Sequence, residues 1–238
     1  DPKTVFLAAT RAKLDDRNPY LFRTTDLGLT WKLITSGIAD TNFTRVVRED
    51  PIRPGLLYAG TDVGVHISFN HGEHWQSLQA NLPVVPIHDL HVKDDDLIVA
   101  THGRGFWIID DVSLLRQLPD LREQDTLHLF TPRDTVRIVN RGRREGNAAG
   151  TQYGMSGPLV VAFENSRTPQ GLPVRSYLDA GANPTDGVLV RYLLPTGHTS
   201  PVTLTFKDAA GKTIRSFSAF SKEGDSLSAK PGMNELRW

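Results

Sequence analysis

Residues 56–75 read LLYAGTDVGVHISFNHGEHW and decide the predicted fold of this 238-residue chain. An apolar run ends at residues 60–62 (GTD), and a second run alternates over residues 64–69. A short polar turn, residues 70–73, then leads to Trp75. Short apolar or alternating runs that are separated by turn residues are typical of antiparallel β-strands. The stretch therefore predicts two strands joined by a tight loop, followed by a turn into a third strand.

The turn and its tryptophan occur twice at one spacing. Residues 24–31 read TTDLGLTW, and residues 68–75 read SFNHGEHW. Asp26 and Asn70 are separated by 44 residues, as are the tryptophans that end the two turns. A repeat of about 40–45 residues is typical of the four-stranded blades of a β-propeller. Two markers with the same spacing therefore predict a structural repeat.

A third copy is less regular. Residues 97–111 read LIVATHGRGFWIIDD, and they lack the glycine and tryptophan of the turn, as an atypical terminal repeat does. We therefore predict consecutive propeller blades over residues 1–130, with residues 126–130 as the outer strand of the last blade.

The side chains of the repeated turn have a structural explanation. An Asp or Asn side chain accepts hydrogen bonds from backbone N–H groups farther along a turn, and glycine permits positive φ. The tryptophan supplies a large apolar group between adjacent sheets. We therefore interpret both turns as structural and expect Asp26 and Asn70 to lie away from any ligand pocket. The residues given this role are Thr24, Asp26, Gly28, Thr30, Trp31, Ser68, Asn70, Gly72 and Trp75.

The first predicted blade lacks an inner strand, so the sequence predicts fewer than three complete blades. A propeller closes with four to eight blades, and an open edge exposes unpaired strand groups. We therefore expect this chain to be part of a longer protein or assembly. The missing propeller blades, from the parent chain or another subunit, are then expected partners.

The composition changes after the predicted blades. Residues 131–157 hold a cluster of arginines and then a stretch rich in Gly, Ala and Asn, which predicts a linker, or alternatively an anion-binding arm. Short strands with turn signals resume at residue 158 and include a hairpin over residues 202–217. We predict a β-sandwich of the immunoglobulin or fibronectin-III kind over residues 158–238. The predicted fold class is all-β.

Composition also excludes several kinds of function. The chain has no Cys, which excludes disulfides, thiolate nucleophiles and Cys-ligated zinc. Its 27 Lys and Arg balance 27 Asp and Glu, so we expect no nucleic-acid partner. No apolar stretch is long enough for a membrane span. Six histidines lie between residues 66 and 102, but their spacing does not converge on one point, and we expect no metal and no cofactor.

The quoted stretches, followed by SLLRQL at residues 113–118, resemble the closing blades of bacterial sortilin-like repeat proteins. The first turn matches the Asp-box, or bacterial neuraminidase repeat, S/T-x-D-x-G-x-T-W at every position, whereas the second has Asn70 and His74 in place of Asp and Thr. The resemblance implies a β-sandwich after the propeller and a bacterial protein exported to the periplasm, cell surface or medium. The family is often labelled glycoside hydrolase because sialidases and xyloglucan-cleaving enzymes also contain the Asp-box.

Candidate ligand-binding residues lie in the loops on the face opposite the repeated turns. Loops 61–64 and 101–105 are expected near the central channel, and they offer Asp62, His102 and Arg104. Arginine binds carboxylate or sulfate groups through paired hydrogen bonds. The alternative is that Asp62 and Arg104 pair with each other.

We predict a non-catalytic binding or scaffolding module of an exported repeat protein that recognises carbohydrate or peptide. One alternative is a fragment of an Asp-box glycoside hydrolase, which requires two carboxyl groups that flank the scissile bond. Another is a structural subunit of a larger surface assembly. No catalytic residue is assigned, because neither the arginine triad and tyrosine of a sialidase nor a carboxylate pair is assembled from this sequence.

Overall fold

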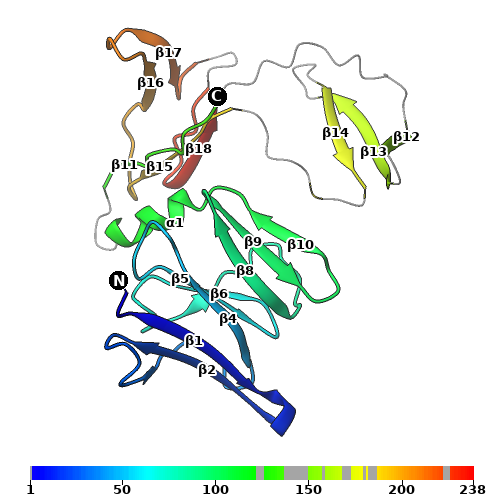
Figure 1. Cartoon of the computed structure of the whole chain (residues 1–238). Coiled ribbons are helices and arrows are strands. Elements are labelled where there is room, and N and C mark those ends of the chain that lie inside the picture. The colour runs from blue at the N-terminus through cyan, green and yellow to red at the C-terminus, as the bar shows by residue number, and fades with distance from the viewer. Residues whose placement is uncertain are drawn as a thin grey trace. The chain divides into compact units, whose positions relative to one another are not determined.

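A computed structural model describes residues 2–121, 126–136, 150–156, 159–167, 173–178, 181, 187–221 and 226–238. These residues form an all-β fold of small antiparallel sheets with one short α-helix (Figure 1). They divide into two compact units, residues 1–133 with 189–237, and residues 134–188 with Trp238. None of the helices in the described ranges has the length and apolarity needed to cross a membrane.

Three antiparallel sheets follow one another along the first part of the chain, and we call them blades 1, 2 and 3 (Figure 1). Blade 1 contains β1 (Val5–Arg11), β2 (Asp16–Thr24) and β3 (Lys32–Leu33), with the 3-10 turn η1 (Ala12–Leu14) between β1 and β2. Blade 2 contains β4 (Thr44–Glu49), β5 (Leu57–Thr61), β6 (Val65–Ser68) and β7 (Gln76–Ser77). Blade 3 contains β8 (Ile87–Lys93), β9 (Asp96–Thr101) and β10 (Phe106–Ile109). The prediction of an all-β fold with propeller-like blades is confirmed.

Blade 2 is buried on both faces because it lies between the other two blades. β1 lies against β4, and both β4 and β5 lie against β8. Successive side chains of a strand point to opposite faces. Leu57 therefore packs in the core shared with blade 1, and the next residue, Tyr58, packs in the core shared with blade 3. All residues of β5 and β6 are buried, which explains why this stretch is largely apolar.

The first repeated turn is closed by its own side chains. Asp26 Oδ1 accepts hydrogen bonds from the Thr24 hydroxyl (2.7 Å) and the Thr30 N–H (2.9 Å). Asp26 Oδ2 accepts a third bond from the Thr30 hydroxyl (2.6 Å). The backbone then passes through positive φ at Leu27 and Gly28.

The second turn repeats this arrangement with an amide. Asn70 Oδ1 accepts bonds from the Ser68 hydroxyl (2.9 Å) and the His74 N–H (3.0 Å). Gly72 has φ of 83°, and a Cβ at this position would lie 2.4 Å from Ile34 Cδ1. The backbone conformation therefore favours glycine, and a side chain at this position would require Ile34 to shift.

The tryptophans that end these turns have different environments. Trp75 is 1% exposed; its Nε1 donates to Ile34 O (2.7 Å) and its backbone N–H donates to Ser36 O (2.8 Å). Trp31 is 44% exposed, and its Nε1 donates to Gly28 O (3.1 Å) within its own turn. Trp75 therefore connects two blades, whereas Trp31 covers its own turn.

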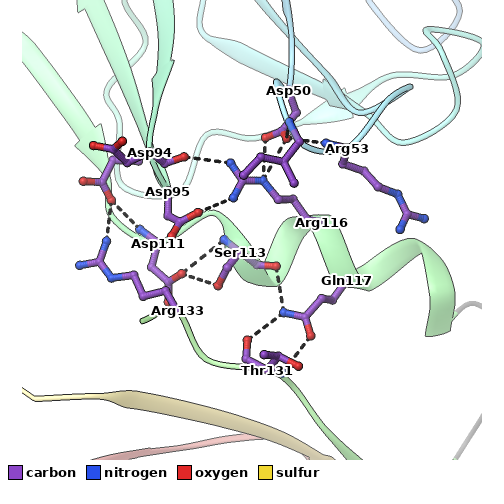
Figure 2. Close-up of polar contacts among 12 residues, drawn as sticks. Asp50, Arg53, Asp94, Asp95, Asp111, Ser113, Arg116, Gln117, Thr131 and Arg133 are labelled. Carbon is purple, nitrogen blue, oxygen red and sulfur yellow. Dashed lines mark hydrogen bonds and ion pairs between the residues drawn. The ribbon is translucent and has the colours of Figure 1, made fainter. Parts of the chain in front are cut away.

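A buried ion-pair network secures the helix that follows blade 3. Helix α1 (Ser113–Gln117) continues into the 3-10 turn η2 (Leu118–Leu121). Arg116 of α1 lies between Asp50, which follows β4, and Asp95, which precedes β9 (Figure 2). Its Nε donates to both carboxylate oxygens of Asp50 at 3.0 Å, and the Asp50 side chain has no exposed surface. The helix is therefore tied to blades 2 and 3 at once.

The strand after the helix does not complete blade 3. β11 (His128–Leu129) pairs with β15 (Leu189–Leu194), which also pairs with β18 (Gly232–Arg237). The prediction that residues 126–130 form the outer strand of blade 3 is therefore wrong. An ion pair between Asp111 and Arg191 (2.8 Å) and a bond from Phe130 N–H to Arg191 O help to hold the chain in this other sheet.

A single sandwich over residues 158–238 is not seen in the described ranges. β12 (Thr151–Ser156), β13 (Leu159–Arg167) and β14 (Pro173–Tyr177) form one three-stranded sheet in the second unit. β15 and β18 belong instead to the first unit, with the hairpin of β16 (Thr203–Lys207) and β17 (Thr213–Ser218), and this hairpin confirms the prediction for residues 202–217. Within the predicted linker, residues 151–156 form β12, and residues 137–149 lie outside the described ranges.

Candidate functional site

The candidate site is built around Asp62, in the loop between β5 and β6. Its backbone N–H donates to Phe43 O (3.2 Å), and its Oδ2 accepts a bond from Arg17 Nη2 at 2.6 Å. The side chain of Asp62 is only 7% exposed. Its other oxygen, Oδ1, is buried and has no hydrogen-bond partner among the described residues. This oxygen is therefore a buried acceptor in need of a donor.

Two guanidinium groups lie over the ring of Phe43. The Cζ of Arg17 is 5.6 Å from the ring centroid, and that of Arg45 is 4.8 Å away. Cations over an aromatic face are attracted by the negative face of the ring. Arg17 also binds Asp62, whereas Arg45 has no carboxylate partner in the described part of the chain. Arg45 is exposed, so its charge is available to a ligand.

Two histidines from blade 3 continue this surface. His88 and His102 stack with their ring centroids 4.9 Å apart, and the N–H of His102 donates to Pro86 O (2.9 Å). Both rings are exposed. His88 and Arg45 line one shallow basin of about 460 Å³. We call the surface formed by these residues the rim; its members are Arg17, Phe43, Arg45, Asp62, His88 and His102.

The rim carries no second available carboxylate among the described residues. Asp16, next to Arg17, pairs with Arg11 at 3.1 Å and accepts a bond from the Tyr20 hydroxyl at 2.7 Å. That bond from Tyr20 is the main reason why the pKa of Asp16 lies below its usual value. A glycosidase mechanism needs a protonated and an ionised carboxyl group on either side of the bond. The described rim residues do not supply this pair, and no three His, Asp or Glu side chains of the described ranges gather as metal ligands.

Of the three ligand-binding residues predicted from the sequence, two belong to the rim. Asp62 and His102 lie in it, but no contact joins them directly. Arg104 is exposed, and its side chain has no partner in the described ranges. The alternative of an Asp62–Arg104 pair is not observed, because Asp62 binds Arg17 instead.

Sequence reasoning missed the cationic and aromatic part of the rim. Phe43 precedes β4, and the strand register shifts between Thr44 and Val46. The contact between Phe43 and Arg45 therefore depends on an irregularity that a two-residue spacing does not predict. Arg17 and His88 carried no signal either, because their positions depend on how neighbouring blades pack.

A second hollow of about 420 Å³ lies beside the turn of blade 2. It is lined by Ile67, Phe69, Asn70, His74, Gln76, Leu118 and Pro119. The expectation that Asn70 lies away from any pocket is therefore wrong. Asn70 Oδ1 is already occupied by two bonds within the turn, which makes it a poor acceptor for a ligand. Asp26 lines neither hollow.

Comparisons with known proteins give little further information. No protein-family model and no curated protein matches the chain. One solved structure that resembles it is the crystal structure of an ancestral GH74 enzyme, at 10% sequence identity and a TM-score of 0.36. The match covers 92% of this chain and 37% of that structure, so the chain spans well under half of its length. A likeness this low supports no argument about activity.

Proposed function

We propose that this chain is a non-catalytic binding module of an exported Asp-box repeat protein, and that its rim binds an acidic carbohydrate. The observation that carries the proposal is the exposed guanidinium of Arg45, which lies over the ring of Phe43, lines the basin and has no carboxylate partner in the described ranges.

The charge of the rim favours carbohydrates that carry carboxylates. Arg17 neutralises Asp62, which leaves Arg45 as the uncompensated charge of the rim. A guanidinium forms strong hydrogen bonds with a carboxylate. The carboxylate of an acidic sugar unit pairs with Arg45. His102 and Arg104, from the β9–β10 loop, then extend the site toward the next sugar units.

The repeated turns have a structural role in this proposal. The side-chain oxygens of Asp26 and Asn70 accept hydrogen bonds from residues of their own turns. The sequence motif and these bonds together support the assignment of both turns as Asp-boxes rather than catalytic sites. The same residues would be expected in a scaffolding repeat protein.

Binding of defined oligosaccharides tests the proposal. The probes are an oligogalacturonate and a neutral galactan oligomer of equal length, titrated calorimetrically into the full chain. We expect the acidic probe to bind more tightly. Arg45→Ala should weaken it about 10–100-fold, because a hydrogen bond to a charged group contributes about 1.5–3 kcal/mol. Arg104→Ala tests the extension of the site and should weaken binding of long oligomers more than that of short ones.

Arg53→Ala is the matched control. Arg53 pairs with Asp120 at 2.7 Å and lies outside the rim. Unchanged affinity in Arg45→Ala would refute the carbohydrate proposal. Release of new reducing ends would instead support a glycoside hydrolase, and tighter binding of a poly-glutamate peptide would identify a peptide-binding module.

A further inference from the structure

The two repeated turns differ at two positions, and both differences lie in the wall of the 420 Å³ hollow beside blade 2. Asn70 of the second turn stands where the first turn has Asp26, and His74 stands where it has Thr30. Asn70 and His74 both line this hollow, whereas Asp26 and Thr30 line neither the hollow nor the basin of the rim. The second turn therefore departs from the first at the positions that border a cavity.

The exchange of a carboxylate for an amide leaves a donor of the second turn unused. Asp26 accepts bonds through both oxygens, and its Oδ2 binds the Thr30 hydroxyl at 2.6 Å. Asn70 closes its turn through Oδ1 alone, and the bond from the His74 N–H identifies this atom as the oxygen. The Asn70 Nδ2 has no acceptor among the described residues and is not one of their fully buried polar atoms. Its two N–H groups are therefore available to a ligand.

Two further polar side chains of the hollow are uncharged and available. His74 and Gln76 are exposed, and no hydrogen bond joins either side chain to another described residue. No Asp, Glu, Lys or Arg is among the described residues that line the hollow. A charged ligand would lose water here without gaining an ion-pair partner. The polar part of the lining therefore favours a neutral ligand with several hydrogen-bonding groups.

The remaining lining is apolar. Ile67 of β6 is 2% exposed and belongs to the core, and Leu118 and Pro119 of η2 add further carbon surface. A ligand that carried only hydroxyl groups would leave this surface against polar atoms. A methyl group next to a carbonyl oxygen suits both parts of the lining, because the oxygen accepts from an amide and the methyl packs on carbon. An acetamido group has this combination.

We propose that this hollow binds the acetamido group of a neutral, N-acetylated sugar. The carbonyl oxygen accepts a bond from Asn70 Nδ2, the methyl group packs against the apolar lining, and sugar hydroxyls bind His74 and Gln76. The turn that supplies Asn70 follows β6, whereas the loop that holds Asp62 precedes it, so the two sites lie at opposite ends of this strand. The site therefore goes beyond the acidic carbohydrate of the proposed function.

Two disaccharides with the same linkage test the role of the acetamido group. The probes are N,N′-diacetylchitobiose and cellobiose, which differ in that the first has acetamido groups where the second has hydroxyls. Each probe is titrated into the full chain while NMR follows the side-chain amide resonances of Asn70 and Gln76. We expect saturable shifts with the acetylated probe. Cellobiose should bind about 10-fold more weakly, because it lacks one hydrogen bond and one buried methyl group.

Variants of the two turns locate the site. Asn70→Asp removes the donor but keeps an oxygen that can close the turn, as Asp26 does in the first turn, and it should weaken binding of the acetylated probe at least about 10-fold. The double variant Asn70→Asp/His74→Thr restores the side chains of the first turn, so it should fold and still fail to bind. Asp26→Asn is the matched control, because it makes the reverse exchange in a turn that does not line the hollow. Circular dichroism checks that all three variants fold.

Four outcomes would overturn the proposal. The first is the absence of a shift in the Asn70 amide, and the second is equal affinity for the two disaccharides. The third is equal affinity of Asn70→Asp and Asp26→Asn for the acetylated probe. The fourth is loss of this binding in Arg45→Ala, which would place the sugar at the rim. Unchanged binding in Arg45→Ala separates this site from the proposed function, whether or not the rim binds an acidic carbohydrate.

Discussion

Trp75 and Ile34 join two neighbouring blades through one hydrogen bond. The indole Nε1 of Trp75 donates to the backbone oxygen of Ile34 at 2.7 Å, and the indole is almost fully buried. Trp31 ends the corresponding turn of blade 1 but donates to Gly28 of its own turn. The same residue type at the same repeat position therefore contributes differently to the stability of this chain.

The first prediction compares the two tryptophans. Trp75→Ala should lower the free energy of unfolding by about 3–5 kcal/mol, because it removes a fully buried aromatic side chain. Trp31→Ala should lower it much less, since this side chain is 44% exposed. Urea denaturation of both variants measures the difference. Equal losses would show that Trp75 does not hold the blades together.

The second prediction concerns the buried arginine of α1. Arg116→Ala leaves the Asp50 carboxylate buried without its ion-pair partner, and such a change costs about 3–5 kcal/mol. Arg53→Ala is the control, because its pair with Asp120 is exposed and exposed pairs contribute about 0–1 kcal/mol. Thermal and urea denaturation give both values. A small loss in Arg116→Ala would indicate that the network is not needed for folding.

The third prediction concerns the pH dependence of stability that Asp26 of the first turn contributes. The hydroxyl bond from Thr30, the Thr30 N–H and the Thr24 hydroxyl lower the pKa of Asp26 from 3.8 to about 2. Because the pKa is lowered in the folded state, its contribution to stability is present above about pH 4 and is lost as the pH falls toward 2. The melting temperature of Asp26→Asn should therefore fall less than that of the unmodified chain as the pH is lowered from about 4 to about 2. The melting temperature of Asn70→Asp, which has a carboxylate in the second turn, should fall more.

If the melting temperature of Asp26→Asn depended on pH as that of the unmodified chain does, the lowered pKa of Asp26 would not be the cause of the acid sensitivity. The carboxyl resonance of Asp26 can also be followed directly by NMR. A midpoint near the ordinary value of 3.8 would show that the turn bonds do not stabilise the carboxylate in solution.

The fourth prediction uses two buried tyrosines. The hydroxyl of Tyr58 has no hydrogen-bond partner in the described ranges, and burial raises the pKa of this group. Tyr58→Phe should therefore leave stability unchanged or increase it, since no bond is lost and a buried polar atom is removed. Tyr192→Phe is the control, because its hydroxyl donates to Ser228 O, and it should lose about 0.5–1.5 kcal/mol.

A loss of more than about 1 kcal/mol in Tyr58→Phe would show that its hydroxyl has a partner in solution. Chemical denaturation of both variants under identical conditions makes the comparison. The comparison contrasts a buried hydroxyl without a partner with one that donates a hydrogen bond.

The blades could be predicted from sequence because their signals are local. The alternation of apolar residues and the turns around Asp26 and Asn70 are each contained in a short stretch of sequence. The hairpin over residues 202–217 is predicted by local signals of the same kind.

Local signals could not predict which sheet residues 126–130 join. β11 leaves blade 3 because it pairs with β15, a strand some 60 residues later, and this choice depends on tertiary contacts.

The candidate site was predicted only in part for the same reason. Asp62 and His102 were found because each lies in a loop with a recognisable turn signal. Arg17 comes to Asp62 from a neighbouring blade, and His88 stacks on His102 across a strand pair. Packing between sheets decides both contacts, and one sequence does not encode that packing in any short pattern.

The contrast between Trp31 and Trp75 gives the chain a label-free optical probe. Indole emission moves to shorter wavelength and resists collisional quenchers when the ring leaves water. Trp75 is already shielded and serves as an internal reference, whereas nearly half of the Trp31 surface is open to solvent. Any molecule that covers Trp31 will therefore change the emission of that residue and not of Trp75. With Trp107 and Trp238, the other two tryptophans of the chain, replaced by phenylalanine, an acrylamide titration of the purified chain can follow such binding.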